Sequence, residues 1–418
     1  MNKNSNFFLE NMFLDSICSQ KKNALFNCTD EELSKVSHYL KLNNSDIKIP
    51  YDSTATKLLE KWQIILNKNK NENNKIAIIC EPNSFYQTSL FPEIFQVPFP
   101  TPTKTKFTFI DLFAGIGGFR IAMQNLGGEC VFSSEWDNDA RRTYMNNFGE
   151  LPFGDITKES VKKCIPEKFD VLCAGFPCQA FSIAGYRKGF EDTRGTLFFD
   201  VATIIKKHRP KAFFLENVKN LKSHDNGRTF EIIESTLKKL GYIVYHKVMN
   251  TMEYCNIPQI RERIFILGFD PLKVSRYKEF TFPNKIKLTK KISDCINPLE
   301  DDESLFYREN SKYYIFLKEA MTDENTIYQW RRQYVRKNQS NVCPTLTANM
   351  GTGGHNVPLV ITPLGFRKLT PYECLQFQGF PNNFKFPNIA KSKCYKQVGN
   401  SVSVPLIQRV ANQIITLL

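Results

Sequence analysis

The sequence has few of the residues on which metal sites, disulfide frameworks and membrane spans depend. It holds 5 His and 12 Cys in 418 residues, and no two cysteines form a Cys-x-x-Cys pair. Zinc sites and disulfide scaffolds need closely spaced ligands, so we expect reduced thiols and no metal. No run approaches the roughly 18 apolar residues of a membrane-spanning helix. The first residues show no signal-peptide pattern, so we expect a cytoplasmic protein without membrane contact.

Acidic residues are scarce relative to basic ones. The chain has 42 Asp and Glu against 56 Lys and Arg, a net charge of +14. This excess favours a polyanionic partner, and nucleic acid more than a membrane surface because no basic amphipathic helix stands out. The 42% hydrophobic and 23% charged content is ordinary for a globular protein, and the length allows two or three domains.

Residues 1–104 form a region of their own. Thr29-Asp-Glu-Glu32 is typical of a helix start, and a second helix is predicted at 54–66. The polar run 67–75 is predicted to be a loop, and the proline-rich stretch 98–102 an extended linker. Two helices are compatible with a helix-turn-helix DNA reader. An interaction or packing module is at least as well supported.

A glycine-rich turn, 113–120, connects a predicted buried strand at 107–112 to a helix. Such a turn lets the backbone approach a ligand closely. Glu135 ends the next strand and can accept hydrogen bonds from a ribose. The dinucleotide fingerprint needs a third glycine where Arg120 stands, so a nucleoside without a pyrophosphate fits better than NAD. Trp136 either stacks on a purine or belongs to the core.

Two further positions are candidate site residues. The first fits a nucleoside, and the second is a candidate reactive thiol. Asp155 follows a helix predicted at 138–148 and can bind the amino group of a base. Cys178 follows a buried strand at 169–174, on a turn stiffened by Pro177. Cysteines are more often inert apolar residues, but this one lies where open α/β sheets bind ligands.

The next strands carry charged residues at their ends. A strand at 212–215 ends in Glu216, so a carboxylate and a thiol should meet at one sheet edge. Arg261 and Arg263 begin another strand, and alternation places both on one face, suited to a phosphate or a base carbonyl. The alternative is a surface ion pair with Glu262, which points to the other face.

From 283 to 366 the regular alternation of strands and helices ends. Residues 327–337 interleave aromatics with positive charges, and 344–358 are rich in glycine and small polar residues. We interpret this as an irregular insertion that approaches DNA. Thr370 and Pro371 then begin a helix, and a last helix runs from 404 to the end. The chain is therefore predicted to be α/β, a doubly wound, mostly parallel sheet with a smaller irregular region.

Six segments, in this order, resemble the DNA (cytosine-5)-methyltransferases of bacterial restriction-modification systems. They are Asp111-Leu-Phe-Ala-Gly-Ile-Gly-Gly-Phe-Arg120, Gly175-Phe-Pro-Cys-Gln-Ala-Phe-Ser182, Glu216-Asn-Val218, Gln259-Ile-Arg-Glu-Arg263, 367–381 and Gln397-Val-Gly-Asn-Ser401. The resemblance covers roughly 107–418. The first hundred residues depart from it, because minimal members start near the first strand.

The resemblance implies a fold, a reaction and a methyl donor. It implies the class I S-adenosylmethionine-dependent methyltransferase fold, with S-adenosylhomocysteine as product. The Cys178 thiolate attacks carbon 6 of cytosine, and Glu216, kept protonated in a dry site, donates to ring nitrogen 3. The positive charges of Arg261 and Arg263 are expected to stabilise the thiolate over the thiol, and Arg263 is expected to contact the base. The implied donor contacts are Phe113, Gly115, Ile116, Gly118, Glu135, Trp136, Asp155, Ile156, Pro177, Leu197, Asn400 and Ser401.

The implied partner is double-stranded DNA with the target base flipped out of the stack. The predicted DNA contacts are Gln179, Ser182, Arg331, Arg336 and Thr345. We expect a catalytic domain at 105–283, a target-recognition domain at 284–385 and a return to the catalytic domain at 386–418. The enzyme is expected to be a monomer whose cognate restriction endonuclease acts independently. The alternatives are an RNA methyltransferase on the same scaffold, and a DNA-binding regulator acting through 1–104.

Overall fold

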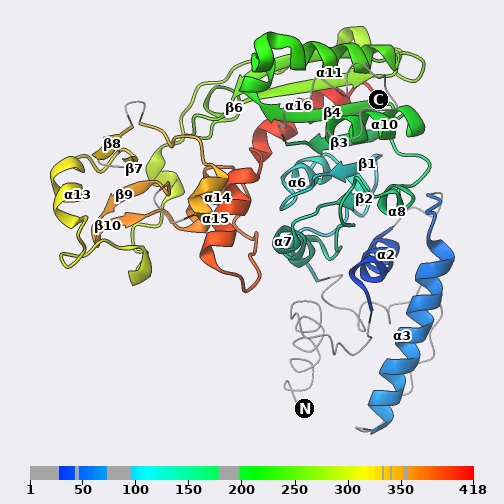
Figure 1. The fold of residues 1–418 in the computed structure, drawn as a ribbon, viewed down its shortest axis with the longest axis horizontal. Helices are drawn as coiled ribbons and strands as arrows, with labels where there is room; N and C mark the ends of the chain where they lie inside the picture. Colours follow the sequence, from blue (N-terminus) through cyan, green and yellow to red (C-terminus); the bar gives the residue numbers. More distant parts are fainter. Residues whose placement is uncertain are drawn as a thin grey trace.

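The computed structural model describes residues 28–42, 47–72, 96–177, 197–331, 334–338, 341–352 and 356–418. Its centre is a six-stranded sheet in the order β2-β1-β3-β4-β6-β5 (Figure 1). The first four strands run parallel, and β6 runs antiparallel to both of its neighbours. The strands are β1 Phe107–Leu112, β2 Gly128–Ser134, β3 Val171–Gly175, β4 Ala212–Val218, β5 Ile243–Asn250 and β6 Glu262–Phe269. The predicted fold class is confirmed.

Helices bury both faces of this sheet. Phe109, Cys173 and Phe214 pack into one core with α6 (Gly118–Gln124) and α16 (Val404–Ile415). Ile110, Leu172 and Phe213, the alternate positions on the same strands, pack into a second core with α10 (Leu197–His208) and α11 (Arg228–Lys239). Strands buried on both faces read as continuous hydrophobic runs, which is why the sequence showed them clearly. The remaining helices of this part are α7 Asn138–Phe148, α8 Glu159–Lys162, α12 Thr251–Tyr254, and the short 3₁₀ turns η1 Lys219–Lys222, η2 His224–Gly227 and η3 Tyr277–Glu279.

The region after β6 is more regular than predicted. It contains an antiparallel four-stranded sheet in the order β10-β9-β7-β8, at the left of Figure 1. Its strands are β7 Tyr328–Arg331, β8 Tyr334–Lys337, β9 Leu359–Thr362 and β10 Gly365–Lys368, and α13 Tyr314–Ala320 covers it. These strands are only four residues long, too short to show a period-2 pattern among charged and small residues. The 3₁₀ turns here are η4 Ile292–Cys295, η5 Glu303–Leu305 and η6 Ala348–Gly351.

Helices α14 (Pro371–Gln376) and α15 (Lys391–Asn400) lie between the two sheets in Figure 1. Helix α14 begins as predicted, with Pro371 in its first turn and a capping box between Thr370 and Glu373. Buried Arg367 forms a salt bridge with Glu373, with an N–O distance of 2.7 Å. Together these contacts fix the point at which the chain returns to the large sheet.

The N-terminal helices are α2 (Asp30–Lys41) and α3 (Asp52–Glu72). The predicted loop at 67–75 is wrong as far as Glu72, because α3 continues through a polar stretch that contains no Gly or Pro to end it. The far end of α3 points away from the rest of the protein (Figure 1). The predicted linker lacks helix and strand, yet Phe99 packs against Phe148 and Phe384. It is therefore packed against α7 and the segment around Phe384.

Among the described residues, no helix combines the length and apolarity that crossing a membrane requires.

Candidate active site

A cleft of about 640 Å³ opens where the parallel strands end. Parallel strands present their carboxyl ends at the same edge, which is where open α/β sheets bind ligands. Because β6 runs in the opposite direction, its first residues reach this edge too. Of the residues predicted from the sequence, those that line the cleft are Phe113, Gly115, Ile116, Glu135, Trp136, Asp155, Ile156, Pro177, Leu197, Glu216, Arg261, Arg263 and Asn400.

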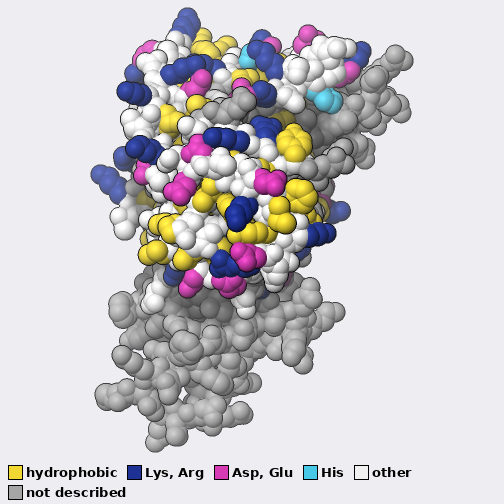
Figure 2. All heavy atoms as spheres, turned by 90° about the vertical axis from the view of Figure 1, so that its left-hand side faces the viewer, with side chains coloured by type: hydrophobic (Ala, Val, Ile, Leu, Met, Phe, Trp, Pro, Cys, Tyr) yellow, Lys and Arg dark blue, Asp and Glu magenta, His cyan; other side chains and the backbone are white. Residues whose placement is uncertain are grey.

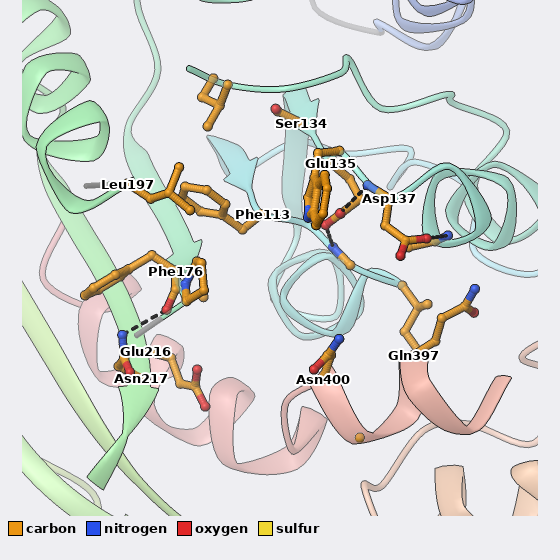
Figure 3. A pocket seen from close by; sticks show the side chains of 18 of the residues that line it. Phe113, Ser134, Glu135, Asp137, Phe176, Leu197, Glu216, Asn217, Gln397 and Asn400 are labelled. Carbon is orange, nitrogen blue, oxygen red and sulfur yellow. Dashed lines mark hydrogen bonds between the residues drawn. The ribbon is translucent and has the colours of Figure 1, made fainter. Parts of the chain in front are cut away.

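One end of the cleft is built around the carboxylate of Glu135 (Figure 3). Its two oxygens accept hydrogen bonds from the backbone N–H groups of Gly115 and Asp137, each at 2.8 Å. Burial raises the pKa of Glu135, and these backbone hydrogen bonds oppose that rise. Gly115 has a left-handed φ of +55°, and a side chain there would project into open space. The glycine turn thus orients the carboxylate and leaves room for a ligand.

Trp136 and Asp155 lie near Glu135 in the lining of the cleft. Trp136 is 74% exposed, so the interpretation of this residue as a core tryptophan is wrong. Asp155 accepts hydrogen bonds from the backbone N–H and the hydroxyl of Thr157, at 2.9 and 2.8 Å. An exposed aromatic ring and two carboxylates in the lining of one cleft have the chemistry of a nucleoside site.

Gly118 and Ser401 were predicted to contact the ligand, but the cleft lining does not include them. A Cβ added to Gly118 would lie 2.7 Å from Val402 Cγ2 and 3.2 Å from the Ser401 hydroxyl oxygen. The two residues therefore pack against one another behind the wall. Sequence position alone did not distinguish a residue in the wall from one that faces the cleft.

The other end of the cleft holds an ion pair between Glu216 and Arg263. Glu216 is 8% exposed at the end of β4, and its Oε1 lies 3.0 Å from Arg263 Nε. In the antiparallel register Val218 lies opposite Arg263. Glu216 is two residues before Val218 on the same face of β4, so its side chain lies next to that of Arg263. Glu262 pairs instead with Lys219. The alternative interpretation, an Arg–Glu262 surface pair, is wrong.

Arg261 lines the cleft, but its guanidinium donates hydrogen bonds to backbone carbonyls. It donates to Leu346 O at 3.0 Å, to Gly399 O at 3.4 Å and to Ser401 O. Burial, with a smaller contribution from neighbouring Arg263, lowers its pKa. Arg261 thus joins three segments of chain, which suits positioning better than contact with a base.

Several cleft residues were not predicted from the sequence. Asp137 caps α7 and forms a salt bridge with Lys396 of α15 at 2.8 Å. Burial works against ionisation of Asp137, but the hydrogen bonds from Lys396 and from backbone N–H groups hold its pKa below the usual value. Their positions next to predicted residues could have revealed them. Asp137 directly follows Trp136, and Lys396 directly precedes the segment 397–401 that resembles the family.

Asn217, also missed, connects two of the matched segments. Its side-chain amide donates a 2.8 Å hydrogen bond to Phe176 O, drawn as a dashed line in Figure 3. The residue after Glu216 thus fixes the turn that leads to Cys178. Cys178, Gln179 and Ser182 themselves lie outside the described residues, and Pro177 is the last described residue before them.

The predicted DNA contacts lie in two different settings. Thr345 donates a 2.6 Å hydrogen bond to Ile260 O, beside the start of β6. Arg336 pairs with Gln329 across the β7–β8 hairpin, and Arg331 donates to that same Gln329 at 2.9 Å. Alternation places these three on one face of the hairpin, opposite Trp330 and Val335, which pack toward α13. In the described ranges, no group of three or more His, Cys, Asp or Glu is placed to hold a metal ion.

Comparisons with known proteins agree with this geometry. A family model described as C-5 cytosine-specific DNA methylase matches residues 107–416. The chain is 52% identical over 309 residues to the type II methyltransferase M.Bsp6I of Bacillus sp. (strain RFL6), covering 72% of this chain and 96% of that protein. It is 47% identical over 338 residues to M.HpaII of Haemophilus parainfluenzae, covering 75% and 90%.

Solved structures share the fold at low sequence identity. The S. pombe Dnmt2 methyltransferase superposes with a TM-score of 0.56 at 19% identity, over 74% of this chain and 98% of that one. A putative DNA modification methyltransferase encoded within an E. coli prophage gives a TM-score of 0.53 at 20% identity, over 75% and 99%. Both comparisons support the architecture of the large sheet and the region that follows it.

Proposed function

The chain belongs to the C-5 cytosine-specific DNA methylase family, and from this we propose that one end of its cleft binds S-adenosylmethionine and the other a flipped-out cytosine. The protein is a DNA (cytosine-5-)-methyltransferase of the restriction-modification type. The observation that carries the proposal is that Glu135 and Glu216 lie at opposite ends of one cleft (Figure 3). Pro177, the residue before the proposed nucleophile, also lines that cleft.

The residues at the Glu135 end fit the donor. Glu135 has free lone pairs for the ribose hydroxyls, the exposed Trp136 ring can stack on the purine, and Asp155 can accept from the purine amino group. Asn400 and Lys396 also line the cleft. When bound, the donor supplies a methyl group on a positively charged sulfur. The role of these residues is to hold that methyl group toward the base.

Cys178 is the proposed nucleophile. Its thiolate adds to carbon 6 of cytosine, which makes carbon 5 nucleophilic enough to take the methyl group. Loss of the proton from carbon 5 and departure of the thiolate from carbon 6 then restore the ring. The hydrogen bond from Asn217 to Phe176 O fixes the backbone two residues before Cys178.

Glu216 and Arg263 are proposed to bind the cytosine. Before a base enters, Glu216 is paired with Arg263. A cytosine at this end places ring nitrogen 3 near Glu216 and its carbonyl oxygen near Arg263. Glu216 must carry a proton to donate to nitrogen 3, so the ion pair must rearrange as the base enters. Arg261 is proposed as a positioning residue, since it links β6 to α15.

The remaining assignments follow from this chemistry. Carbon 6 is inaccessible in a stacked duplex, so the base must leave the helix, which costs a few kcal/mol. We propose 105–283 and 386–418 as the catalytic domain and 284–385 as the target-recognition domain, with Arg331, Arg336, Thr345, Gln179 and Ser182 contacting DNA. We further propose a cytoplasmic monomer with an independently acting endonuclease.

Covalent trapping tests the proposal. The methylated sequence is first found by bisulfite sequencing of DNA from cells expressing the protein. Duplex DNA carrying 5-fluorocytosine at that position should then form a stable adduct in the presence of the donor, because fluorine cannot leave carbon 5 as a proton does. Peptide mapping should place the adduct on Cys178.

Cys178→Ala should form no adduct, whereas Cys173→Ala, a fully buried thiol on β3, should still be trapped. An adduct on another cysteine, or methylation by Cys178→Ala, would disprove the assignment.

A further inference from the structure

Helix α2 lies outside the part of the chain that the family model matches, yet it packs on the catalytic sheet. Leu33 and Val36 of α2 and Trp62 of α3 share a buried core with Phe132 of β2 and with Phe153. Strand β2 is an edge strand. The unpaired backbone groups of an edge strand need another partner. Helix α2 supplies such a partner.

His38 of α2 provides a hydrogen-bond partner for the backbone of Ser133, at the edge of β2. Its Nδ1 lies 2.9 Å from Ser34 O, and a carbonyl only accepts, so Nδ1 carries the proton. Nε2 of the neutral ring is then the acceptor, and the Ser133 N–H donates to it at 3.2 Å. The Ser133 hydroxyl lies 3.0 Å from the same nitrogen. Burial lowers the pKa of His38, which favours this neutral form.

Two serines of α2 hold the segment that lies beside β2. Ser34 Oγ donates to Pro152 O at 3.2 Å, and Ser37 Oγ accepts from the Leu151 N–H at 3.1 Å. Phe153 then bonds to β2 through its N–H to Ser133 O and its carbonyl from the Glu135 N–H, both at 2.8 Å. Helix α2 therefore holds both backbone segments that lead to the site: the end of β2, which precedes Glu135, and the segment that precedes Asp155.

We propose that α2 is a positioning element of the donor site, with His38 acting through Ser133 on Glu135 and Trp136. The proposal rests on the proposed function, because the ligand concerned is S-adenosylmethionine. A helix that reads DNA must present a free face to the groove. In α2, Ser34, Ser37 and His38 are all buried against the catalytic domain. For α2, packing is thus favoured over DNA reading.

The test uses the full-length enzyme and compares the donor KM and Kd with kcat. His38→Ala should raise the donor KM and Kd about 3- to 30-fold, as for the loss of one or two neutral hydrogen bonds. kcat per trapped active site and the affinity for DNA should stay within about twofold. His38→Gln, whose amide oxygen can accept from the Ser133 N–H, should recover most of the donor affinity. Glu31→Gln, on the exposed side of α2, is the matched control and should behave as wild type.

Active-site titration with 5-fluorocytosine DNA separates positioning from folding. If His38→Ala lowers only the active fraction and leaves the donor KM unchanged, the helix is merely structural and the proposal is wrong. It is also wrong if donor affinity stays constant while DNA affinity falls. Should His38→Ala fail to fold, the Ser34→Ala/Ser37→Ala pair decides, with a raised donor KM expected. A wild-type enzyme that binds no S-adenosylmethionine would instead refute the proposed function.

Discussion

At the scale of single residues, the structure places a buried carboxylate at each end of the cleft and gives each a different partner. Glu135 is bound by backbone N–H groups, which cannot move away as a ligand enters. Glu216 is bound by the side chain of Arg263, which can rotate. The first arrangement suits recognition of a ligand in one orientation. The second suits a group whose partner changes during a reaction.

Glu135→Ala should weaken S-adenosylmethionine binding far more than DNA binding. Losing a charge-assisted hydrogen bond costs about 1.5–3 kcal/mol, which corresponds to about 10- to 150-fold in affinity. Calorimetry with each ligand measures the effect. Glu129→Ala, at the opposite end of β2 where Thr105 donates to the carboxylate, should leave the donor affinity of the folded enzyme unchanged. Unchanged donor affinity in Glu135→Ala would remove Glu135 from the site.

His38 should make the stability of the enzyme depend on pH. Burial lowers its pKa from 6.5, and the groups facing it are Glu150, which raises it, and Arg120, which lowers it. The unfolded chain therefore binds the proton more readily than the folded one. The contribution of neutral His38 is present above pH 6.5 and is lost as pH falls toward the lowered pKa of the folded state.

Denaturant unfolding at several pH values checks this expectation. Between pH of about 7 and 5, wild type should lose more unfolding free energy than His38→Gln, which has no group titrating there. Burial opposes the ionisation of Glu150, which lies 3.6 Å from Nε2, but Arg120 holds the pKa of this carboxyl below its usual value. Glu150 therefore reduces the effect without reversing it. Equal pH dependence in the two proteins would show that folding leaves the pKa of His38 unchanged.

At the scale of elements, α15 packs very closely against the segment before η6. A Cβ added to Gly399 would lie 2.1 Å from the carbonyl carbon of Thr347, so only glycine allows this approach. The Gly399 carbonyl also accepts from Arg261. This one position therefore holds β6, α15 and the segment before η6 together.

Gly399→Ala should destabilise the enzyme by about 1–3 kcal/mol or more, because backbone must shift to make room. Gly154→Ala is the matched control, since a Cβ there meets nothing within 4 Å. Chemical denaturation of the two variants measures the difference. A Gly399→Ala protein as stable as the control would mean that the two segments can separate at little cost.

The β7–β8 hairpin is the element to which we assign sequence choice. Its Arg331 and Arg336 share the face opposite α13, where they can reach phosphates or pair with guanine. We leave the following segment, 341–347, out of this assignment, because Cys343 and Thr345 are hydrogen-bonded to the backbone around Gln259 and Ile260.

Replacing residues 328–338 with the equivalent hairpin of a relative with a different target should redirect methylation to that target, with 341–347 left in place. Bisulfite sequencing reads the outcome. Arg336→Ala separates two roles: a phosphate contact weakens binding at all sequences, whereas a base contact costs about 1–3 kcal/mol at one position. An active chimera that keeps its original target would place sequence reading elsewhere.

At the scale of the whole molecule, the chain carries a net charge of +14. Figure 2 shows the face that carries the small sheet, where Lys and Arg side chains alternate with acidic and apolar ones. A dispersed positive charge favours DNA in general without selecting a sequence.

DNA affinity should therefore fall steeply with salt. An enzyme that neutralises 6–10 phosphates loses roughly 10³- to 10⁵-fold in affinity between about 50 and 200 mM salt. Fluorescence anisotropy over that range measures how DNA affinity falls with salt. The affinity for S-adenosylhomocysteine analogues without net charge, measured in parallel, should depend little on salt. A flat salt response for DNA would mean that phosphate contacts contribute little to binding.

The sequence by itself determined the local elements and the chemistry at their ends. The strand at 107–112 and the helix at 138–148 lie where they were predicted, because buried strands and capped helices leave continuous or periodic apolar patterns. Local sequence also marked Glu135, Glu216 and Arg263 as residues at strand ends. It failed where the pattern was weak, in the polar end of α3 and in the four-residue strands of the small sheet.

Only the tertiary structure decided how these local pieces meet. The antiparallel insertion of β6 brings Arg263 to Glu216, and the packing of Ser401 against Gly118 leaves both outside the cleft lining. The docking of α2 puts His38 against Ser133, 95 residues away in the chain. Strand direction, strand order and helix docking depend on contacts between distant segments. Such contacts leave no periodic trace in the sequence around either partner, because each segment satisfies its own local pattern regardless of which neighbour it will meet.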